Sequence, residues 1–214
     1  MSERPERVIL LHGLWMPRLS MHWLAGRLRR AGFAPEFFGY ATVMGGPDAA
    51  IPRLADHLRR GPAHVLAHSL GGLVALTALE RNPDLPVRRV VCLGSPLCGS
   101  GAAKGLAGHA WSAASLGRSA ALLHRGCPPW RGPAEVGVVA GSTPLGLGRY
   151  FGHFAGANDG TVAVEETCLQ GLADHTVIAT SHTGLLLSPE VARLAVTFFR
   201  HGRFDQAGRS GPIE

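Results

Sequence analysis

Residues 63–82 read AHVLAHSLGGLVALTALERN and join a short apolar run to a longer run through a serine. The first part, AHVLAH, has the length of a buried strand, and the part after the serine has the length and apolar content of a helix. Ala67 and Gly71 stand two positions before and two after Ser69. A strand that bends sharply into a helix needs small residues there, because larger side chains would crowd the bend. The stretch therefore predicts a strained turn that exposes Ser69, although a plain tight turn containing a serine is the alternative.

The rest of the chain repeats this alternation of strand-like and helix-like segments. The strand-like segments are continuous apolar runs, which is typical of parallel strands buried on both faces. We therefore expect an α/β fold: one domain over residues 1–214, with about six mostly parallel strands, helices on both faces and little or no cap. The expected strands are 7–11, 36–40, 63–68, 87–96, 135–142 and 175–181. The expected helices are 20–32, 47–61, 71–82 and 188–201.

Some helix ends are marked by capping and stop residues. Ser20 is expected to cap the first helix, and Gly32 to end it. Pro52 predicts that the second helix starts near it, because proline suits a first turn. Ser188 and Pro189 predict the cap and the first residue of the last helix.

Three segments do not fit the alternation. Residues 98–132 are rich in Gly, Ala and Ser and are expected to form small helices and loop, with a possible lid-like insertion. Residues 143–174 show little regular pattern, and long irregular stretches in compact domains are usually functional. Residues 203–214 are expected to be a flexible tail.

Composition narrows the class of protein. The 214 residues are 46% hydrophobic, and their net charge of +6 comes from arginines scattered toward predicted helix ends. Because no aromatic residues are interleaved with a basic run, we expect no nucleic-acid partner.

The start of the chain lacks a signal-peptide pattern, and no apolar run is long enough for a membrane span, so we expect a cytoplasmic protein without integral membrane association. The four cysteines form no C-x-x-C pair, which argues against a disulfide framework and a zinc site, and we expect no metal or cofactor.

A serine that acts as a nucleophile needs a histidine to take its proton, and the chain has eleven histidines. His182, in TSHTG, follows the last predicted strand and precedes the last helix, at the carboxyl edge where sites of parallel sheets collect. His68 adjoins Ser69, but its ring does not easily fold back onto the hydroxyl, so we interpret it as structural. Asp159, in NDGTV, gives the chain order Ser69, Asp159, His182. Asp174 is the next candidate acid, followed by Glu165 and Glu166.

Two backbone amides are candidate donors for an oxyanion. Ser69 is predicted at a helix N-terminus, where unpaired N–H groups favour negative charge, so the N–H of Leu70 would face an oxyanion beside the serine. The segment LLHGLW ends the first strand at the same edge, and the N–H of Leu14 is the candidate second donor.

Together these motifs resemble the α/β-hydrolases. VILLHGLW, HVLAHSLGGLVAL, VCLGSPLCGS, NDGTVAVEET and SHTGLLLSPEVARLAVTFF occur in the expected order. The chain is similar, over about residues 7–200, to small bacterial lipases and esterases of the Bacillus minimal-lipase type, whose elbow also begins with Ala. The resemblance implies Ser69 as nucleophile, Asp159 as acid, His182 as base, and Leu14 and Leu70 as the oxyanion hole.

The resemblance implies a serine hydrolase of carboxylic esters that acts on a small-molecule ester or lipid-like substrate. An acyltransferase or thioesterase with the same residues is one alternative, and a non-catalytic binding protein of this fold is another. Apolar residues beside the expected site favour an apolar acyl or aryl group, although each is equally compatible with core packing. These residues are Leu14, Trp15, Met16, Leu97, Leu185 and Leu186, with Trp15 the strongest candidate.

Overall fold

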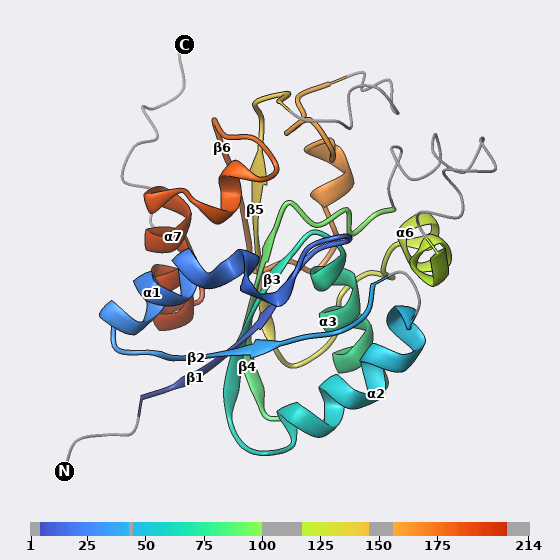
Figure 1. The fold of residues 1–214 in the computed structure, drawn as a ribbon, viewed down its shortest axis with the longest axis vertical. Coiled ribbons are helices and arrows are strands. Elements are labelled where there is room, and N and C mark those ends of the chain that lie inside the picture. Colours follow the sequence, from blue (N-terminus) through green and yellow to red (C-terminus); the bar gives the residue numbers. More distant parts are fainter. Residues whose placement is uncertain (1–4, 43–44, 100–116, 146–155, 205–214) are drawn as a thin grey trace.

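The computed structural model describes residues 5–42, 45–99, 117–145 and 156–204. Its centre is a six-stranded sheet in the order β2-β1-β3-β4-β5-β6, and all neighbouring strands are parallel, which confirms the expected fold class (Figure 1). The strands are β1 (Arg7–Leu11), β2 (Ala34–Phe38), β3 (Ala63–His68), β4 (Val87–Leu93), β5 (Glu135–Gly141) and β6 (Asp174–Ile178). The α-helices are α1 (His22–Arg30), α2 (Gly46–Leu58), α3 (Leu70–Arg81), α6 (Ala120–Arg125) and α7 (Pro189–His201). Short 3-10 turns are η1 (Arg18–Met21), η2 (Gly117–Ser119), η4 (Glu165–Thr167) and η5 (Gly184–Leu186).

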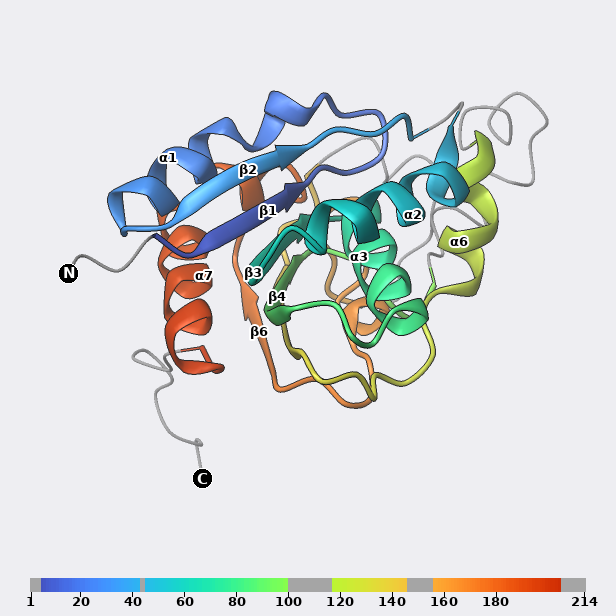
Figure 2. The ribbon, with the colours of Figure 1, turned by 90° about the horizontal axis from the view of Figure 1, so that it is seen from below.

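Helices cover both faces of the sheet. Helices α1 and α7 lie on one face, and α2, α3 and α6 lie on the other (Figure 2). The alternation of side chains along β3 divides the apolar core between the two faces. Val65 and Ala67 pack in the core beneath α2 and α3, whereas Leu66 packs in the core beneath α1 and α7. Because both faces are covered, β3 is buried along its whole length, as its continuous apolar sequence predicts.

The strand order creates a switch point at the carboxyl edge. The chain goes from β1 outward to β2 and then returns to β3 on the other side of β1. Leu11 at the end of β1 lies beside Ala67 near the end of β3, and His68 lies beside Leu93. The loops after β1 and β3 therefore leave adjacent strands at the place where sheets of this type hold their sites.

The expected start of the second helix was wrong. Helix α2 begins at Gly46, and Pro52 lies inside it. Proline removes one N–H from the helical ladder, here the one that would pair with the Asp48 carbonyl. The helix continues because Ile51 and Leu54, on either side of Pro52, are buried against the sheet.

Ser20 does not cap the first helix. A 3-10 turn, Arg18–Met21, precedes α1, and the N-cap position is Met21. The hydroxyl of Ser20 is instead enclosed without a hydrogen-bond partner among the described residues. The other marked ends are confirmed: Gly32 follows α1 with φ +91°, and the Ser188 hydroxyl accepts from the Val191 N–H at 3.3 Å.

Several predicted boundaries shift by a few residues. The second strand was expected at 36–40 but runs Ala34–Phe38, because β2 is an edge strand that tolerates Pro35 while pairing with β1. Residues 100–116 of the segment 98–132 and residues 205–214 of the tail lie outside the described residues, so the lid-like insertion and the flexible tail remain predictions.

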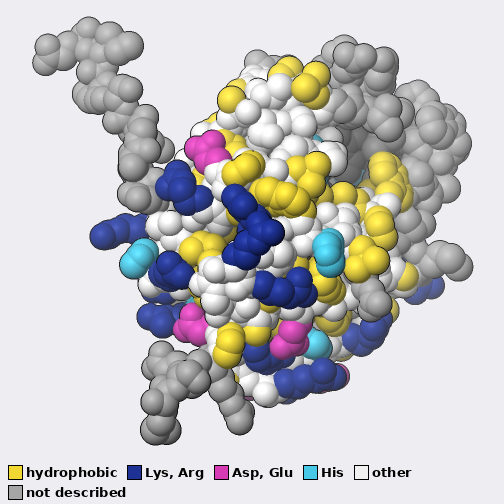
Figure 3. All heavy atoms as spheres, turned by 60° about the vertical axis from the view of Figure 1, so that its left-hand side comes forward, with side chains coloured by type: hydrophobic (Ala, Val, Ile, Leu, Met, Phe, Trp, Pro, Cys, Tyr) yellow, Lys and Arg dark blue, Asp and Glu magenta, His cyan; other side chains and the backbone are white. Residues whose placement is uncertain are grey.

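The surface over α1 and α7 carries many of the basic side chains. Three arginines lie in the last turn of α1, and Arg200 and His201 lie in the last turn of α7. Figure 3 shows Lys and Arg side chains spread over this side of the molecule, with acidic and hydrophobic side chains among them. Within the described ranges, no helix has both the length and the hydropathy needed to cross a membrane.

Candidate active site

Ser69 sits in a strained turn between β3 and α3. Its φ of 54° and ψ of −122° place a non-glycine residue in a region that L-amino acids rarely adopt. The turn is fixed by the Ser69 N–H, which donates to the Leu93 carbonyl at 2.9 Å. Gly71 must be small, because a Cβ there would lie 2.7 Å from the Leu11 carbonyl oxygen. The predicted strained serine turn is therefore present.

The hydroxyl of Ser69 makes no hydrogen bond to another described residue, and the residue is 9% exposed. Leu70, the first residue of α3, has an amide that donates no hydrogen bond within the described part of the chain. The amide of Leu14 likewise has no acceptor there. Both predicted oxyanion donors are thus unpaired within the described part of the chain.

His182 and Asp159 form a hydrogen-bonded pair across two loops. The Nδ1 of His182 lies 2.7 Å from the carboxylate Oδ2 of Asp159, and the His182 backbone N–H donates to the Asp159 carbonyl at 2.9 Å. An ionised carboxylate only accepts, so Nδ1 carries the proton and Nε2 presents its lone pair. Nε2 makes no hydrogen bond to another described residue.

The Asp159 side chain is oriented by its own loop. It is only 1% exposed, and its Oδ1 accepts from the backbone N–H groups of Thr161 at 2.9 Å and Val162 at 2.7 Å. These donors compensate the burial of a charge and leave Oδ2 for His182. The carboxylate is therefore held in place before any substrate arrives.

The other candidate acids have different local contacts. Asp174 lies at the start of β6, away from the carboxyl edge, where it accepts from the His175 and Phe204 backbone N–H groups at 2.8 and 2.7 Å. Glu166 accepts from the Ala163 N–H at 2.9 Å, and Glu165 is exposed in η4. Of the four candidate acids, Asp159 is the one with a hydrogen bond to the His182 imidazole.

Ser69 and the His182 pair lie on either side of the turn that follows β4. The Ser69 N–H donates a hydrogen bond to the Leu93 carbonyl. A Cβ on Gly94, which follows Leu93, would be 3.1 Å from His182 Nδ1 and 3.0 Å from Asp159 Oδ2. The described contacts include no hydrogen bond between the Ser69 hydroxyl and the His182 imidazole. Such bonds often tighten only when substrate binds.

The loop after β1 is anchored by residues that the sequence analysis missed. The Tyr40 hydroxyl donates to the His12 carbonyl at 2.7 Å, and the two rings stack with centroids 4.6 Å apart. The Trp15 N–H donates to the Thr42 hydroxyl at 3.3 Å. Burial lowers the pKa of His12, so its Nδ1–H donates to the Gly13 carbonyl as a neutral ring. The contacts of Tyr40 and Thr42 with this loop join residues 28 and 27 positions apart, and no local sequence pattern predicts them.

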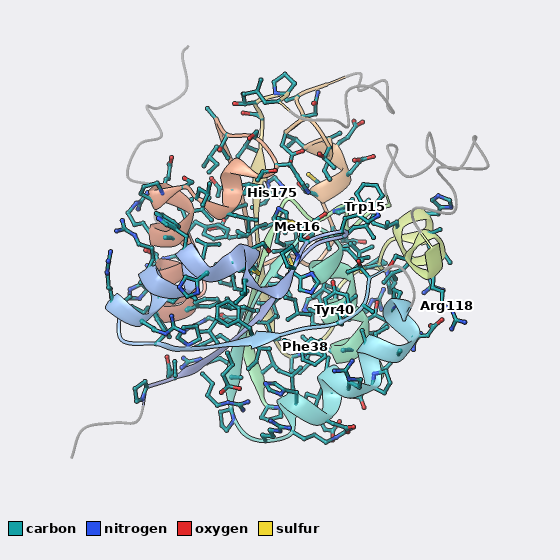
Figure 4. All side chains as sticks on the ribbon, viewed as in Figure 1. Trp15, Met16, Phe38, Tyr40, Arg118 and His175 are labelled. Atoms are coloured by element: carbon teal, nitrogen blue, oxygen red, sulfur yellow. The ribbon has the colours of Figure 1, made fainter. Side chains whose placement is uncertain are left out.

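The candidate substrate-contacting residues separate into two kinds. Trp15 is 58% exposed and Met16 is half-buried, and in Figure 4 both lie beyond the end of β1, above Tyr40. Leu97 and Leu185 are fully buried, one in each core. These two leucines pack inside the protein in this structure and do not line an open surface.

The sheet order, the parallel pairing and the strained serine turn after β3 define an α/β-hydrolase fold. Among the residues that the structure describes, no three His, Cys, Asp or Glu side chains gather as a metal site would require.

Solved structures share this fold at low sequence identity. Lipase BlEst2 of Bacillus licheniformis in its propeptide form matches with a TM-score of 0.73 and 18% identity over 100% of this chain and 53% of that one, so this chain spans about half of that form. The mature form of the lipase matches with a TM-score of 0.68 and 18% identity, over 94% of this chain and 93% of that one. An extracellular α/β-hydrolase from a Paenibacillus species matches with a TM-score of 0.56 and 15% identity, over 96% and 100%. No family model and no curated protein matches the chain.

Proposed function

We propose that the chain is a serine hydrolase of carboxylic esters, with Ser69 as nucleophile, His182 as base and Asp159 as the acid that orients it. The observation that carries the proposal is the state of the two reactive atoms. The Ser69 hydroxyl and His182 Nε2 both lack a hydrogen-bond partner among the described residues, although the Ser69 backbone and the His182 ring are each held by another hydrogen bond. A structural serine or histidine in such a turn would normally pair its polar atom within the protein.

The reaction follows from this arrangement. His182 Nε2 takes the hydroxyl proton of Ser69 as the oxygen attacks the ester carbonyl carbon, and the carbonyl electrons move to its oxygen. The Leu14 and Leu70 amides stabilise that oxyanion, and one such donor contributes roughly 3–4 kcal/mol in comparable enzymes. The imidazolium then protonates the departing alcohol and leaves an acyl-serine. His182 next deprotonates a water that attacks the acyl carbon and releases the acid.

The substrate class is supported by the surroundings of the site and by the comparisons. Trp15 and Met16 offer apolar surface next to the predicted oxyanion loop, which suits an apolar acyl or aryl group. The solved structures with this fold include a lipase and a metagenomic carboxyl esterase. We propose a small-molecule ester or a lipid-like ester as substrate.

The proposal is tested with p-nitrophenyl esters of increasing acyl length. With an activated ester whose acyl-enzyme is hydrolysed more slowly than it forms, the wild-type protein should release p-nitrophenol in an initial burst equal to the concentration of sites, because the acyl-enzyme accumulates. Ser69→Ala should abolish the burst and reduce turnover to the background rate. Adding an alcohol separates hydrolysis from acyl transfer, since a transferase would give the new ester as its main product.

A further inference from the structure

His68 contacts the loop that carries the proposed base. It is the last residue of β3, and its ring is 1% exposed. Its Nε2 lies 3.0 Å from the carbonyl oxygen of His182, and the two imidazole rings lie 4.6 Å apart between centroids, inclined by 48°. Because a carbonyl oxygen only accepts, the Nε2 of His68 carries the proton.

The surroundings of the second ring nitrogen of His68, Nδ1, keep the ring neutral. Nδ1 is enclosed and has no hydrogen-bond partner among the described residues. It faces the loop after β1, where a Cβ on Gly13 would lie 3.0 Å away. A proton at Nδ1 would place an unpaired cation beside the His182 ring. Burial, and then the neighbouring His182 ring, lower the pKa of His68 to about 3.

The backbone of His182 is consequently held on both sides. Its N–H donates to the Asp159 carbonyl at 2.9 Å, and its carbonyl accepts from His68 at 3.0 Å. The first contact comes from the loop of the proposed acid, and the second comes from the residue next to the proposed nucleophile. These two hydrogen bonds fix the position of the His182 backbone, from which the imidazole ring extends between Asp159 and Ser69.

We propose that His68 is a positioning residue that holds the His182 backbone through its Nε2–H and so aligns the imidazole between Asp159 and Ser69. This inference rests on the proposed function. The sequence suggested only a structural role for His68, whereas this proposal gives it a role in aligning the base. Loss of the His68 Nε2–H donor should misalign the Nε2 of His182 without removing any group that takes part in the reaction.

The test compares two His68 variants with a matched control. His68→Phe keeps a buried ring but removes the donor, whereas His68→Gln retains an N–H at a similar reach. His64→Phe is the control, because His64 is also a buried histidine of β3 with an enclosed, unpartnered Nδ1. His64 lies four residues earlier and stacks on Phe199, with centroids 4.9 Å apart.

Three readouts are measured on protein shown to be folded by its melting curve. His68→Phe should lower kcat for a short p-nitrophenyl ester, and the rate of inactivation by a fluorophosphonate, by about 10- to 100-fold, with KM little changed. His68→Gln should recover part of that loss. The low-field proton resonance of His182 Nδ1–H should shift or broaden in His68→Phe and remain in His68→Gln. His64→Phe should lower the melting temperature and leave kcat and the resonance unchanged.

A purely structural role predicts a different pattern. The inference is overturned if folded His68→Phe reacts at the wild-type rate and keeps the wild-type resonance, or if His64→Phe lowers kcat as much as His68→Phe does. The failure of the proposed function is distinguishable, because a wild-type protein that neither turns over esters nor reacts with the fluorophosphonate contradicts that function whatever the variants do. In that case an unchanged resonance in His68→Phe would also overturn the positioning role.

Discussion

Asp159 and His182 are joined twice, by a 2.7 Å contact between carboxylate and imidazole and by a 2.9 Å bond from the His182 N–H to the Asp159 carbonyl. The first bond determines which ring nitrogen of His182 holds the proton, and the second fixes the position of the His182 backbone that carries the ring. Two loops separated by strand β6 therefore act as one unit at the carboxyl edge of the sheet.

Asp159→Asn should leave the fold intact and remove the control of the His182 tautomer. The amide oxygen of the new side chain can still accept from Thr161 and Val162, but its NH₂ group would then face His182 and favour a proton on the wrong nitrogen. We expect kcat for a short ester to fall by roughly 10³- to 10⁴-fold. Steady-state kinetics check this, together with an unchanged melting curve, and activity close to wild type would show that another acid serves His182.

Gly94→Ala should disrupt the site through crowding and through backbone strain. The new Cβ would lie 2.8 Å from Leu185 Cδ1 and 3.0 Å from Asp159 Oδ2, at a residue whose φ is +52°. We expect loss of ester turnover and a lower free energy of unfolding. Gly26→Ala is the control, because nothing lies within 4 Å of its Cβ position in α1. That change should stabilise the protein by about 0.5–1 kcal/mol and keep its activity.

Acidification should destabilise the protein through its buried histidines. The pKa of His68 falls from 6.5 to about 3 on folding, so below the unfolded value the unfolded chain binds a proton that the native protein does not. Stability is thus fully present above about pH 6.5 and is lost as the pH falls toward the folded value. Between about pH 7 and about pH 5, the loss of unfolding free energy that comes from His68 should amount to about 2 kcal/mol.

Urea unfolding at the two pH values measures this share. His68→Gln, which cannot take up the proton, should lose less stability on acidification than the wild type. An equal loss in both proteins would mean that His68 does not carry the effect. His12 and His64, whose pKa values burial also lowers, should retain their own contributions in the variant.

Trp15→Ala should alter substrate preference with little effect on stability. The side chain is 58% exposed, so its removal leaves little buried cavity. We expect the advantage of longer acyl or aryl esters over acetate to shrink, mainly through a higher KM. Leu185→Ala, at a fully buried position, should instead cost about 2–5 kcal/mol of stability. An unchanged chain-length profile in Trp15→Ala would remove Trp15 from the substrate surface.

The fold was predictable where local chemistry decides it. The continuous apolar run of β3 and the small residues around Ser69 predicted the strand, the turn and the helix, and β3 has the predicted bounds of 63–68. The capping serine and proline of α7 were equally local signals, and the last helix begins at the predicted residue.

The missed features depend on tertiary contacts. Pro52 could not be placed inside α2 without knowing that Ile51 and Leu54 bury one side of that helix. The Tyr40 contact with His12 joins the segments that follow β2 and β1, and the His68 contact with His182 spans 114 positions. Spacing along the chain could suggest Asp159 and His182 as partners, but only their folded loops show which atoms meet.

Covalent labelling by a fluorophosphonate, followed by intact-mass measurement and peptide mapping, tests most directly whether Ser69 is the nucleophile. We expect one phosphonyl group per wild-type molecule, located on the peptide that contains Ser69, and no labelling of Ser69→Ala. A wild-type protein that remains unlabelled, or a label on another residue that persists in Ser69→Ala, would contradict this role.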